Sequence, residues 1–344
     1  MTGRPMPPGP DFPIPSELTK SASSADSPKG PADLPASGWT RWLDRAGLAA
    51  GLISLSGLLV RLTICDAFPP FSTLYYATPL PLLTAGFAAW TLRRRNGTGR
   101  KILGLITLIL AVWTVGTHWH RQTPRGVAGK SVKVLFWNTG RGTFSSSPAI
   151  AAEITRAGAD IVVLVEAVPW KEPDAIRQFW REACPQYQPS ILGGGIVMLS
   201  RFPSGETQTA DLPLKSITRQ VEVDCEGHPL TLLICDLGSN PLRSRQPVLT
   251  QVAEAAERLA DRPTLVLGDF NTPLDSLHFA PLRKSYRNVF EDAGSGYLAT
   301  WPMPVPVLSL DQMWINDHVE PGACHHLWTV RSDHRPVLAE LGLP

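Results

Sequence analysis

Three long apolar runs lie between residues 46 and 120 of the chain. Residues 46–65 contain one charged side chain, Arg61, near the far end of the run, where its long stem can reach the membrane interface. Residues 67–92 and 102–120 contain no aspartate, glutamate, lysine or arginine. About twenty apolar residues cross a bilayer as a helix, and these runs are apolar all round rather than along one stripe. The pattern predicts three transmembrane helices.

The residues that flank these runs predict an orientation. Five basic residues separate the second run from the third: Arg93, Arg94, Arg95, Arg100 and Lys101. Loops rich in lysine and arginine remain in the cytoplasm. Alternation of three spans then predicts a cytoplasmic N-terminus and an extracytoplasmic location for everything after His120. Residues 1–40 carry nine prolines and little apolar periodicity, which predicts a disordered tail.

From residue 130 onward the apolar runs are shorter and alternate with helical patterns. Short buried strands are expected at 132–137, 161–165, 195–199, 220–223, 230–235, 264–267 and 307–315. Helices are expected at 148–157, 173–183 and 247–260, each with a proline in its first turn. This alternation is typical of an α/β domain. We therefore divide the chain into a Pro-rich tail (1–40), a membrane anchor (41–121) and a globular domain (130–344).

Composition narrows the choice of function. The 344 residues include 32 lysines and arginines against 30 aspartates and glutamates, for a net charge of +2. This balance excludes a strongly basic binder of polyanions. Five cysteines without a Cys-x-x-Cys pair exclude a small disulfide-stapled scaffold. Residues 324–326, Cys-His-His, are expected in a surface loop, because one short loop rarely provides a metal site.

Polar side chains recur where the predicted strands end. Asn138, Glu166, Asp236, Asp269 and Asn271 follow predicted strands directly or closely. Asp311 lies within the strand expected at 307–315, and Asp333 and His334 precede the last strand. Such strand ends are where α/β folds place their sites. Mg²⁺ prefers one or two carboxylates together with water and phosphate oxygens, and Asn138, Glu166 and Asp333 supply such a shell. Asp269 and Asn271 are placed to orient a water and a phosphate oxygen.

These segments resemble the endonuclease/exonuclease/phosphatase superfamily, which has a deoxyribonuclease-like fold. The matching segments are Val134-Leu-Phe-Trp-Asn138, Asp160-Ile-Val-Val-Leu-Val-Glu166, Gly195-Ile-Val-Met-Leu-Ser-Arg-Phe-Pro203, Val266-Leu-Gly-Asp-Phe-Asn-Thr272, Leu310-Asp311 and Ser332-Asp-His-Arg-Pro336. They follow the order of the superfamily and span essentially the whole domain. The resemblance implies a four-layer α/β sandwich, with two packed mixed sheets flanked by helices, preceded here by three transmembrane helices.

The resemblance also implies hydrolysis of a phosphate ester, with a phosphodiester favoured, by an enzyme that depends on Mg²⁺ or Mn²⁺. Asn138 and Glu166 resemble its metal pair, assisted by Asp333. The near-neutral net charge argues against tight binding of nucleic acid and so weakens the hypothesis of a nuclease. Because the domain is expected at a bilayer, a phospholipid headgroup is a reasonable substrate as well as nucleic acid. No protein partner is evident from the sequence, and the lipid bilayer is the partner of the three spans.

By position, the remaining residues resemble the catalytic group of the superfamily. Asp269 resembles the residue that positions or deprotonates the attacking water, and Asn271 a phosphate clamp. His334, oriented by Asp311, resembles the histidine that contacts the scissile phosphate or acts as a base. One position departs from the pattern: Asp236 stands where many members carry a histidine that protonates the leaving group.

Three interpretations of the aspartate at position 236 stay open. Asp236 can serve as the general acid if burial or a like charge raises its pKa. Alternatively, Asp236 binds a second metal, or Asn240 contacts the phosphate. The departure also motivates a rival function, a catalytically silent module of the same fold that holds a phosphorylated ligand. The leading hypothesis remains a membrane-anchored, extracytoplasmic, metal-dependent phosphoesterase.

Overall fold

The computed structural model describes residues 38–94, 96–167 and 172–344. Leu43–Pro344 form one compact unit, which holds most of the apolar segment and the whole α/β domain. The disordered tail expected at residues 1–40 lies almost entirely outside the described residues and stays a prediction.

Four helices precede the domain: α1 (Gly38–Thr63), α2 (Phe71–Ala77), α3 (Leu80–Arg93) and α4 (Thr98–His118). Among the described residues, two of them, α1 and α4, are long and apolar enough to cross a membrane. The span predicted at 67–92 is wrong as a single helix, because it divides into α2 and α3. Pro79 lies at the break, where its missing N–H cannot continue a helix. The 14 residues of α3 extend about 21 Å, less than the roughly 30 Å of a hydrocarbon core.

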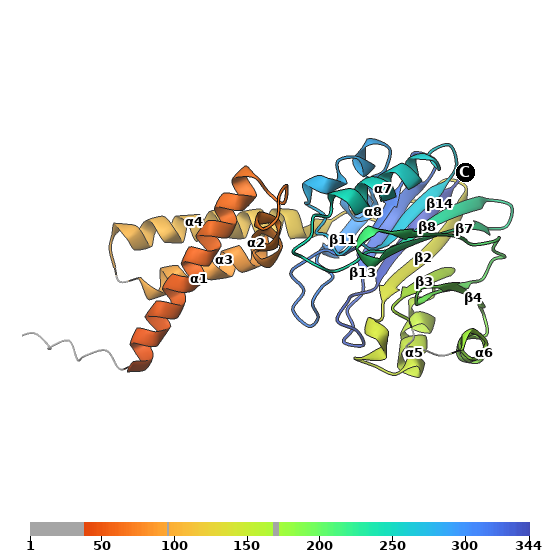
Figure 1. Ribbon diagram of the computed structural model, residues 1–344, viewed down its shortest axis with the longest axis horizontal. Helices are drawn as coiled ribbons and strands as arrows, with labels where there is room; N and C mark the ends of the chain where they lie inside the picture. The colour runs from red at the N-terminus through yellow and green to blue at the C-terminus, as the bar shows by residue number, and fades with distance from the viewer. Residues whose placement is uncertain (1–37, 95, 168–171) are drawn as a thin grey trace, which may run out of the picture. The chain divides into compact units, whose positions relative to one another are not determined.

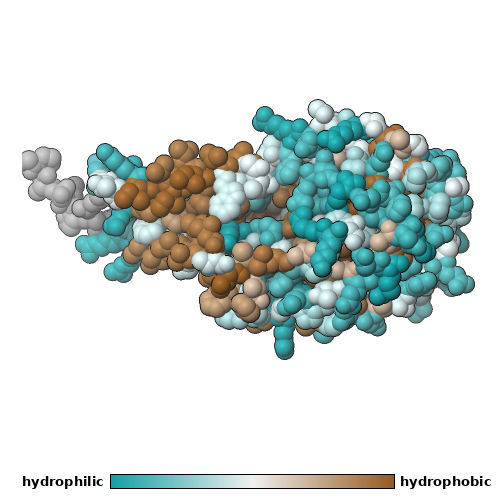
Figure 2. Space-filling model, turned by 90° about the horizontal axis from the view of Figure 1, so that it is seen from above, coloured by the Kyte–Doolittle hydropathy of each residue, from teal (hydrophilic) through white to brown (hydrophobic). Residues whose placement is uncertain are grey.

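Small side chains let α1, α3 and α4 pack closely. A Cβ added at Gly51 of α1 would lie 2.4 Å from the ring of Trp90 in α3. Between α3 and α4, the hydroxyl oxygens of Thr84 and Thr114 lie 2.9 Å apart. The outward faces stay apolar, and hydrophobic surface covers the helices whereas mostly hydrophilic surface covers the domain (Figure 2). On α4 the exposed apolar side chains are Ile102, Leu105, Leu108, Ile109, Val112 and Val115.

Two sheets form the centre of the domain (Figure 1). The eight-stranded sheet has the order β1 (Trp119–Arg121), β11 (Gly294–Tyr297), β13 (Glu320–His326), β14 (Val337–Leu343), β2 (Lys130–Asn138), β3 (Ile161–Val165), β5 (Ile196–Ser200) and β4 (Gln188–Gly193). The six-stranded sheet has the order β10 (Arg287–Asn288), β12 (Asp311–Ile315), β9 (Thr264–Asp269), β8 (Pro229–Asp236), β7 (Ser216–Asp224) and β6 (Gln208–Leu212). Both are mixed, since β2–β3 and β8–β9 are parallel pairs among antiparallel ones.

The core is divided by the alternation of side chains along the strands. In β2, Val132, Val134 and Phe136 join the core between the sheets, whereas Leu135 and Trp137 join the layer under the helices. The helices that flank the sheets are α5 (Ser147–Ala157), α6 (Pro173–Ala183), α7 (Gln246–Glu257) and α8 (Val289–Ala293). Helices α5 and α6 cover the eight-stranded sheet, and α7 packs on the core of the other (Figure 1). The expected α/β fold with two mixed sheets flanked by helices is confirmed.

Two local predictions need correction. The strand expected at 307–315 is confined to Asp311–Ile315. Residues 324–326, expected in a surface loop, lie in β13. There Cys324 is buried and the His326 ring stacks on Phe290, with 4.2 Å between the ring centroids. The two histidines and the cysteine therefore belong to a packed strand.

Strand register places three aspartates in one row across the six-stranded sheet. Asp236 of β8 lies opposite Asp269 of β9, and Asp269 lies opposite Asp311 of β12. Just before this row, Gly268 of β9 lies opposite Cys235 of β8. The register is thus what brings three carboxylates to one edge of the sheet.

Replacing Gly268 with Ala should destabilise the domain. The added Cβ would lie 2.0 Å from the Cys235 carbonyl oxygen, so β8 and β9 would have to separate. We expect the free energy of unfolding to fall by about 1–3 kcal/mol. Urea unfolding of the full chain in detergent, followed by tryptophan fluorescence, measures this loss. Gly205→Ala is the matched control, because its Cβ would meet nothing closer than the Glu222 carbonyl at 3.8 Å. Equal stability of the two variants would contradict the close approach.

Candidate active site

A buried histidine lies between two of the three aligned aspartates. His334 Nδ1 is 2.9 Å from the Asp311 carboxylate, and His334 Nε2 is 4.0 Å from Asp269 Oδ2. All three residues are buried, and their ligand atoms lie within 4.8 Å of one another. The eight-stranded sheet carries His334 just before β14, whereas the two aspartates belong to the six-stranded sheet. The cluster therefore joins the two sheets.

The charges of the aspartates and of His334 determine which members of this cluster carry a proton. Burial alone would lower the pKa of His334, but the neighbouring carboxylates Asp311 and Asp269 outweigh it and raise the pKa well above its usual range. Burial raises the pKa of Asp269, and the His334 imidazolium opposes this shift only in part. The arrangement favours a protonated imidazole that donates from Nδ1 to Asp311 and presents its other edge toward Asp269.

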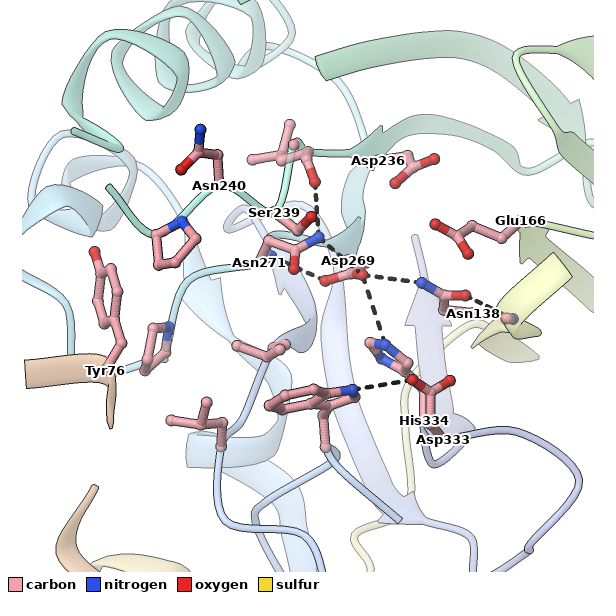
Figure 3. A pocket seen from close by; sticks show the side chains of 18 of the residues that line it. Tyr76, Asn138, Glu166, Asp236, Ser239, Asn240, Asp269, Asn271, Asp333 and His334 are labelled. Atoms are coloured by element: carbon pink, nitrogen blue, oxygen red, sulfur yellow. Dashed lines mark hydrogen bonds and ion pairs between the residues drawn. The ribbon is translucent and has the colours of Figure 1, made fainter. Parts of the chain in front are cut away.

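Two asparagine side chains fix the Asp269 carboxylate from both sides (Figure 3). Asn138, at the end of β2, donates from Nδ2 to Asp269 Oδ2 over 3.0 Å. Asn271 donates from its backbone N–H to Oδ1 over 2.9 Å and from Nδ2 to Oδ2 over 3.1 Å. Asn271 adopts a left-handed backbone, with φ 46°. Such a conformation is uncommon outside glycine, and asparagine tolerates it best.

Glu166 also has a left-handed backbone, with φ 49°, in the first turn after β3. Its backbone carbonyl accepts hydrogen bonds from the Thr139 hydroxyl and the Arg141 N–H, both over 2.9 Å. The same Arg141 reaches the Glu166 carboxylate at 3.3 Å. Strained backbone of this kind persists where surrounding bonds determine it, and it concentrates at functional sites. Neither the strain nor Arg141 was visible in the sequence pattern.

Asp236 faces Glu166 across one side of the pocket (Figure 3). Burial, and next the charge of Glu166, raise the pKa of Asp236 to about 6. Asp236 therefore retains its proton to a higher pH than an ordinary aspartate. This is the condition under which a carboxyl group can replace a histidine as a proton donor.

The loop before β14 is tied down by bonds that sequence reasoning missed. The Trp301 indole donates to Asp333 Oδ2 over 3.1 Å, and the Trp137 indole donates to the His334 carbonyl over 3.0 Å. The Ser332 hydroxyl donates to the Asn138 carbonyl over 2.8 Å. Nothing in the local pattern marked Trp301 as part of a site, because its contact with Asp333 depends on tertiary structure alone.

One cavity of about 1050 Å³ is lined by nearly all of the site residues expected from the sequence. Those that line it are Asn138, Glu166, Asp236, Asp269, Asn271, Asp333 and His334, together with Asn240. Asp311 lies behind His334 and does not line the cavity. Three arginines, Arg141, Arg243 and Arg245, line it too, as do Thr73 and Tyr76 of α2. The short helix α2 was not expected near the site.

The donor set of this cavity fits a hard divalent cation. Its oxygen donors are the carboxylates of Glu166 and Asp333 and the amide oxygen of Asn138, all on the cavity wall. Mg²⁺ and Mn²⁺ prefer such oxygen ligands. Asp236 and Asp269 line the same cavity and add further carboxylate oxygens.

Comparison with known proteins shows which fold this is. An endonuclease/exonuclease/phosphatase family protein from Bacteroides thetaiotaomicron superposes with a TM-score of 0.52 at 16% identity, covering 62% of this chain and 97% of that one. A mannosyl-6-phosphatase from the same species gives 0.52 at 16% identity, covering 61% and 99%. D. rerio TDP2, complexed with a single strand DNA product, gives 0.51 at 15% identity, covering 62% and 99%. At these identities the likeness shows the fold alone.

The match of the sequence itself is more specific. No curated protein matches the chain. Residues 135–334 match the Endonuclease/Exonuclease/phosphatase family. This segment begins in β2 and ends at His334, so it contains every residue of the cavity that comes from the α/β domain. The chain belongs to the Endonuclease/Exonuclease/phosphatase family.

Proposed function

We propose that the α/β domain hydrolyses a phosphate ester, with a phosphodiester favoured, in a reaction that depends on a divalent metal ion. The observation that supports this most is the buried cluster of Asp269, His334 and Asp311, of which Asp269 and His334 line a cavity that also carries Glu166 and Asp236. It combines a carboxylate of raised pKa, a cationic imidazole and a separate proton donor. Family membership and the phosphatase among the structural neighbours agree with it.

In this proposal Asp269 holds and deprotonates the attacking water. Burial raises the pKa of Asp269, which makes it a stronger base than an ordinary aspartate. Asn138 and Asn271 keep its carboxylate in one orientation. The water oxygen forms a bond to phosphorus as the ester P–O bond breaks. The water proton passes to Asp269, and the leaving oxygen takes a proton from Asp236.

The imidazolium of His334 would stabilise the negative charge that develops on the phosphate oxygens. Asp311 would act as a positioning residue, because it holds the ring and raises its pKa but does not reach the cavity. Asn240, and the side chains of Arg243 and Arg245, are placed on the cavity wall to contact the phosphate.

The metal would be held by Asn138, Glu166 and Asp333, with Mg²⁺ or Mn²⁺ as the ion. When bound, such an ion neutralises charge on the phosphate oxygens and lowers the barrier to attack. The bonds of Asn138 to Asp269 and of Ser332 to Asn138 link these ligands to the catalytic cluster. Loss of one ligand should therefore disturb both parts of the site.

We also infer that α1 and α4 anchor the protein in a membrane. What supports this is their length together with their exposed apolar faces, since only 11% of the most apolar stretch of α4 is buried. Basic residues lie at the helix ends remote from the domain: Arg45, Arg93, Arg94, Arg100 and Lys101. Under the positive-inside rule these ends are cytoplasmic, so the domain is extracytoplasmic. The chain must then return to the cytoplasmic side between α1 and α4, a passage that α2 and α3 make as two short helices rather than as one span.

The rival function is a silent module that binds a phosphorylated ligand. It is favoured by a single observation, the aspartate at position 236 in place of a histidine. The raised pKa of Asp236 weakens that argument, because the carboxyl group meets the requirement for a proton donor.

Asp269→Ala and His334→Ala should each lower kcat by about 100-fold or more, the range for loss of a general acid or base. The assay uses the full chain in detergent with Mg²⁺ or Mn²⁺ against bis(p-nitrophenyl) phosphate, single-stranded DNA and phospholipid vesicles. Chelation of the metal should abolish turnover of the same substrate. His318→Ala, an exposed histidine, serves as the control. Full activity in both variants would rule out the assigned site, and phosphate-ligand binding without any turnover would favour the rival module.

Asp311→Asn should lower the pKa of His334, because it removes the largest influence that raises that pKa while keeping an oxygen for Nδ1–H. An NMR titration of isotope-labelled histidine in the metal-free protein measures the shift, with the signal assigned by its loss in His334→Gln. The exposed Asp317→Asn is the control. An unchanged titration of His334 would show that Asp311 does not set its charge.

A cysteine placed at Glu206, exposed on the domain, should react with a membrane-impermeant maleimide in intact cells. A cysteine at Gly99, near the basic end of α4, should react only after the membrane is permeabilised. Four of the five native cysteines are buried, so the background is low. The reverse labelling pattern would place the domain in the cytoplasm.

A further inference from the structure

A second cavity, of about 400 Å³, lies where the apolar helices meet the α/β domain. Leu80 of α3 and Trp113 and Gly116 of α4 line it from the helices. Leu298 and Leu308 line it from the domain. Its size lies within the range of small-molecule sites, and such sites are mostly apolar with a few polar groups. This cavity has no part in the chemistry proposed above.

The second cavity shares a wall with the candidate active site. Pro273 and Leu308 line both cavities. Pro273 follows Asn271, the asparagine bonded to Asp269, by two residues. The two cavities thus adjoin at Pro273 and Leu308, and the first contains several carboxylates whereas the second is mainly apolar.

The junction that forms the second cavity is fixed by buried polar contacts. Arg61 of α1 forms an ion pair with Asp275 and lies over the Tyr75 ring at 4.0 Å. The Tyr75 hydroxyl donates to the Asp275 carbonyl over 3.0 Å. Asp66, which is 1% exposed, accepts from the Leu277 backbone N–H over 3.0 Å. These bonds hold the helices as one wall of the cavity, so the cavity is preformed.

Charge at the cavity rim does not oppose an apolar occupant. Arg61 and Asp275 pair with each other and with Tyr75, so their charges are largely satisfied by the protein. The remaining lining is mainly apolar, with Thr117, His118, His120 and Ser309 as its polar members. The one further carboxylate, Glu291, is ion-paired with Arg283. The cavity also adjoins α4, whose outward side chains are apolar and exposed. The apolar surface of α4 therefore lies beside this cavity, and the charged groups of its lining are paired within the protein.

We propose that the second cavity binds the hydrocarbon part of an amphiphilic phosphoester, drawn from the bilayer, whose phosphate lies in the candidate active site. This deepens the proposed function and rests on it: the substrate would be a membrane lipid with a phosphate ester rather than a nucleic acid. The shared wall at Pro273 and Leu308 sets the two parts of such a molecule side by side. The helices are then part of the substrate site as well as an anchor.

Gly116 allows a test that fills the cavity without touching the active site. A Cβ added there meets no atom within 4 Å, and Gly116 lines the second cavity only. The series Gly116→Ala, Leu and Trp adds increasing volume. Gly99→Trp, at the opposite end of the same helix and likewise in open space, is the matched control. The full chain is used in detergent, with gel filtration to establish that each variant remains folded.

The first readout is binding of hexadecylphosphonate and of methylphosphonate, measured by calorimetry. We expect affinity for the long-chain phosphonate to fall progressively along the series, by at least about tenfold for Trp, because each excluded methylene loses burial. Affinity for methylphosphonate should stay within about twofold. Gly99→Trp should bind both ligands as the native protein does. Unchanged affinity for hexadecylphosphonate in Gly116→Trp would overturn the proposal.

The second readout separates this proposal from the proposed function. Hydrolysis of bis(p-nitrophenyl) phosphate should be unaffected by Gly116→Trp, whereas hydrolysis of phosphatidylglycerol in vesicles should fall at least about tenfold. If no substrate is hydrolysed but the binding series behaves as expected, the lipid site stands and the hydrolase assignment fails. If hydrolysis occurs and both substrates respond alike, the lipid site is refuted and the hydrolase assignment stands.

Discussion

The site depends on one electrostatic constraint, the alignment of three aspartates on neighbouring strands of the six-stranded sheet. Asp236, Asp269 and Asp311 lie opposite one another in β8, β9 and β12. Like charges placed directly opposite destabilise a sheet, so the row needs positive charge or bound protons. His334 supplies charge between two members, and a raised pKa provides the proton for the third.

The side chains that contact these aspartates come from the eight-stranded sheet. Asn138 ends β2 and His334 precedes β14, and both reach across to Asp269 or Asp311. The site therefore exists only while the two sheets stay packed, and the apolar core between them holds these atoms in register. Bonds such as Ser332 to Asn138 then keep the reaching side chains in a single orientation.

Strand-end residues could be predicted from the sequence because short buried strands and the polar residues after them are local features. Asn138, Glu166 and Asp269 were found this way, and they line one cavity. Strand pairing could not be predicted, because it depends on contacts far apart in the chain. The break at Pro79 could not be predicted because the apolar run around it is uninterrupted. Burial of His326 could not be predicted because a histidine is polar. The place of α2 beside the site depended on tertiary structure alone.

The ion pair of Arg61 affects the order in which the protein can fold during synthesis. It lies in an apolar helix near the start of the chain, and its partner Asp275 follows 214 residues later. During synthesis the helix exists long before the carboxylate that balances its charge. The helical segment can thus reach its final arrangement only after β9 and the turn beyond it have been made. The contacts among the helices themselves, such as Gly51 against Trp90, can form earlier, whereas the ion pair of Arg61 has to wait for the domain.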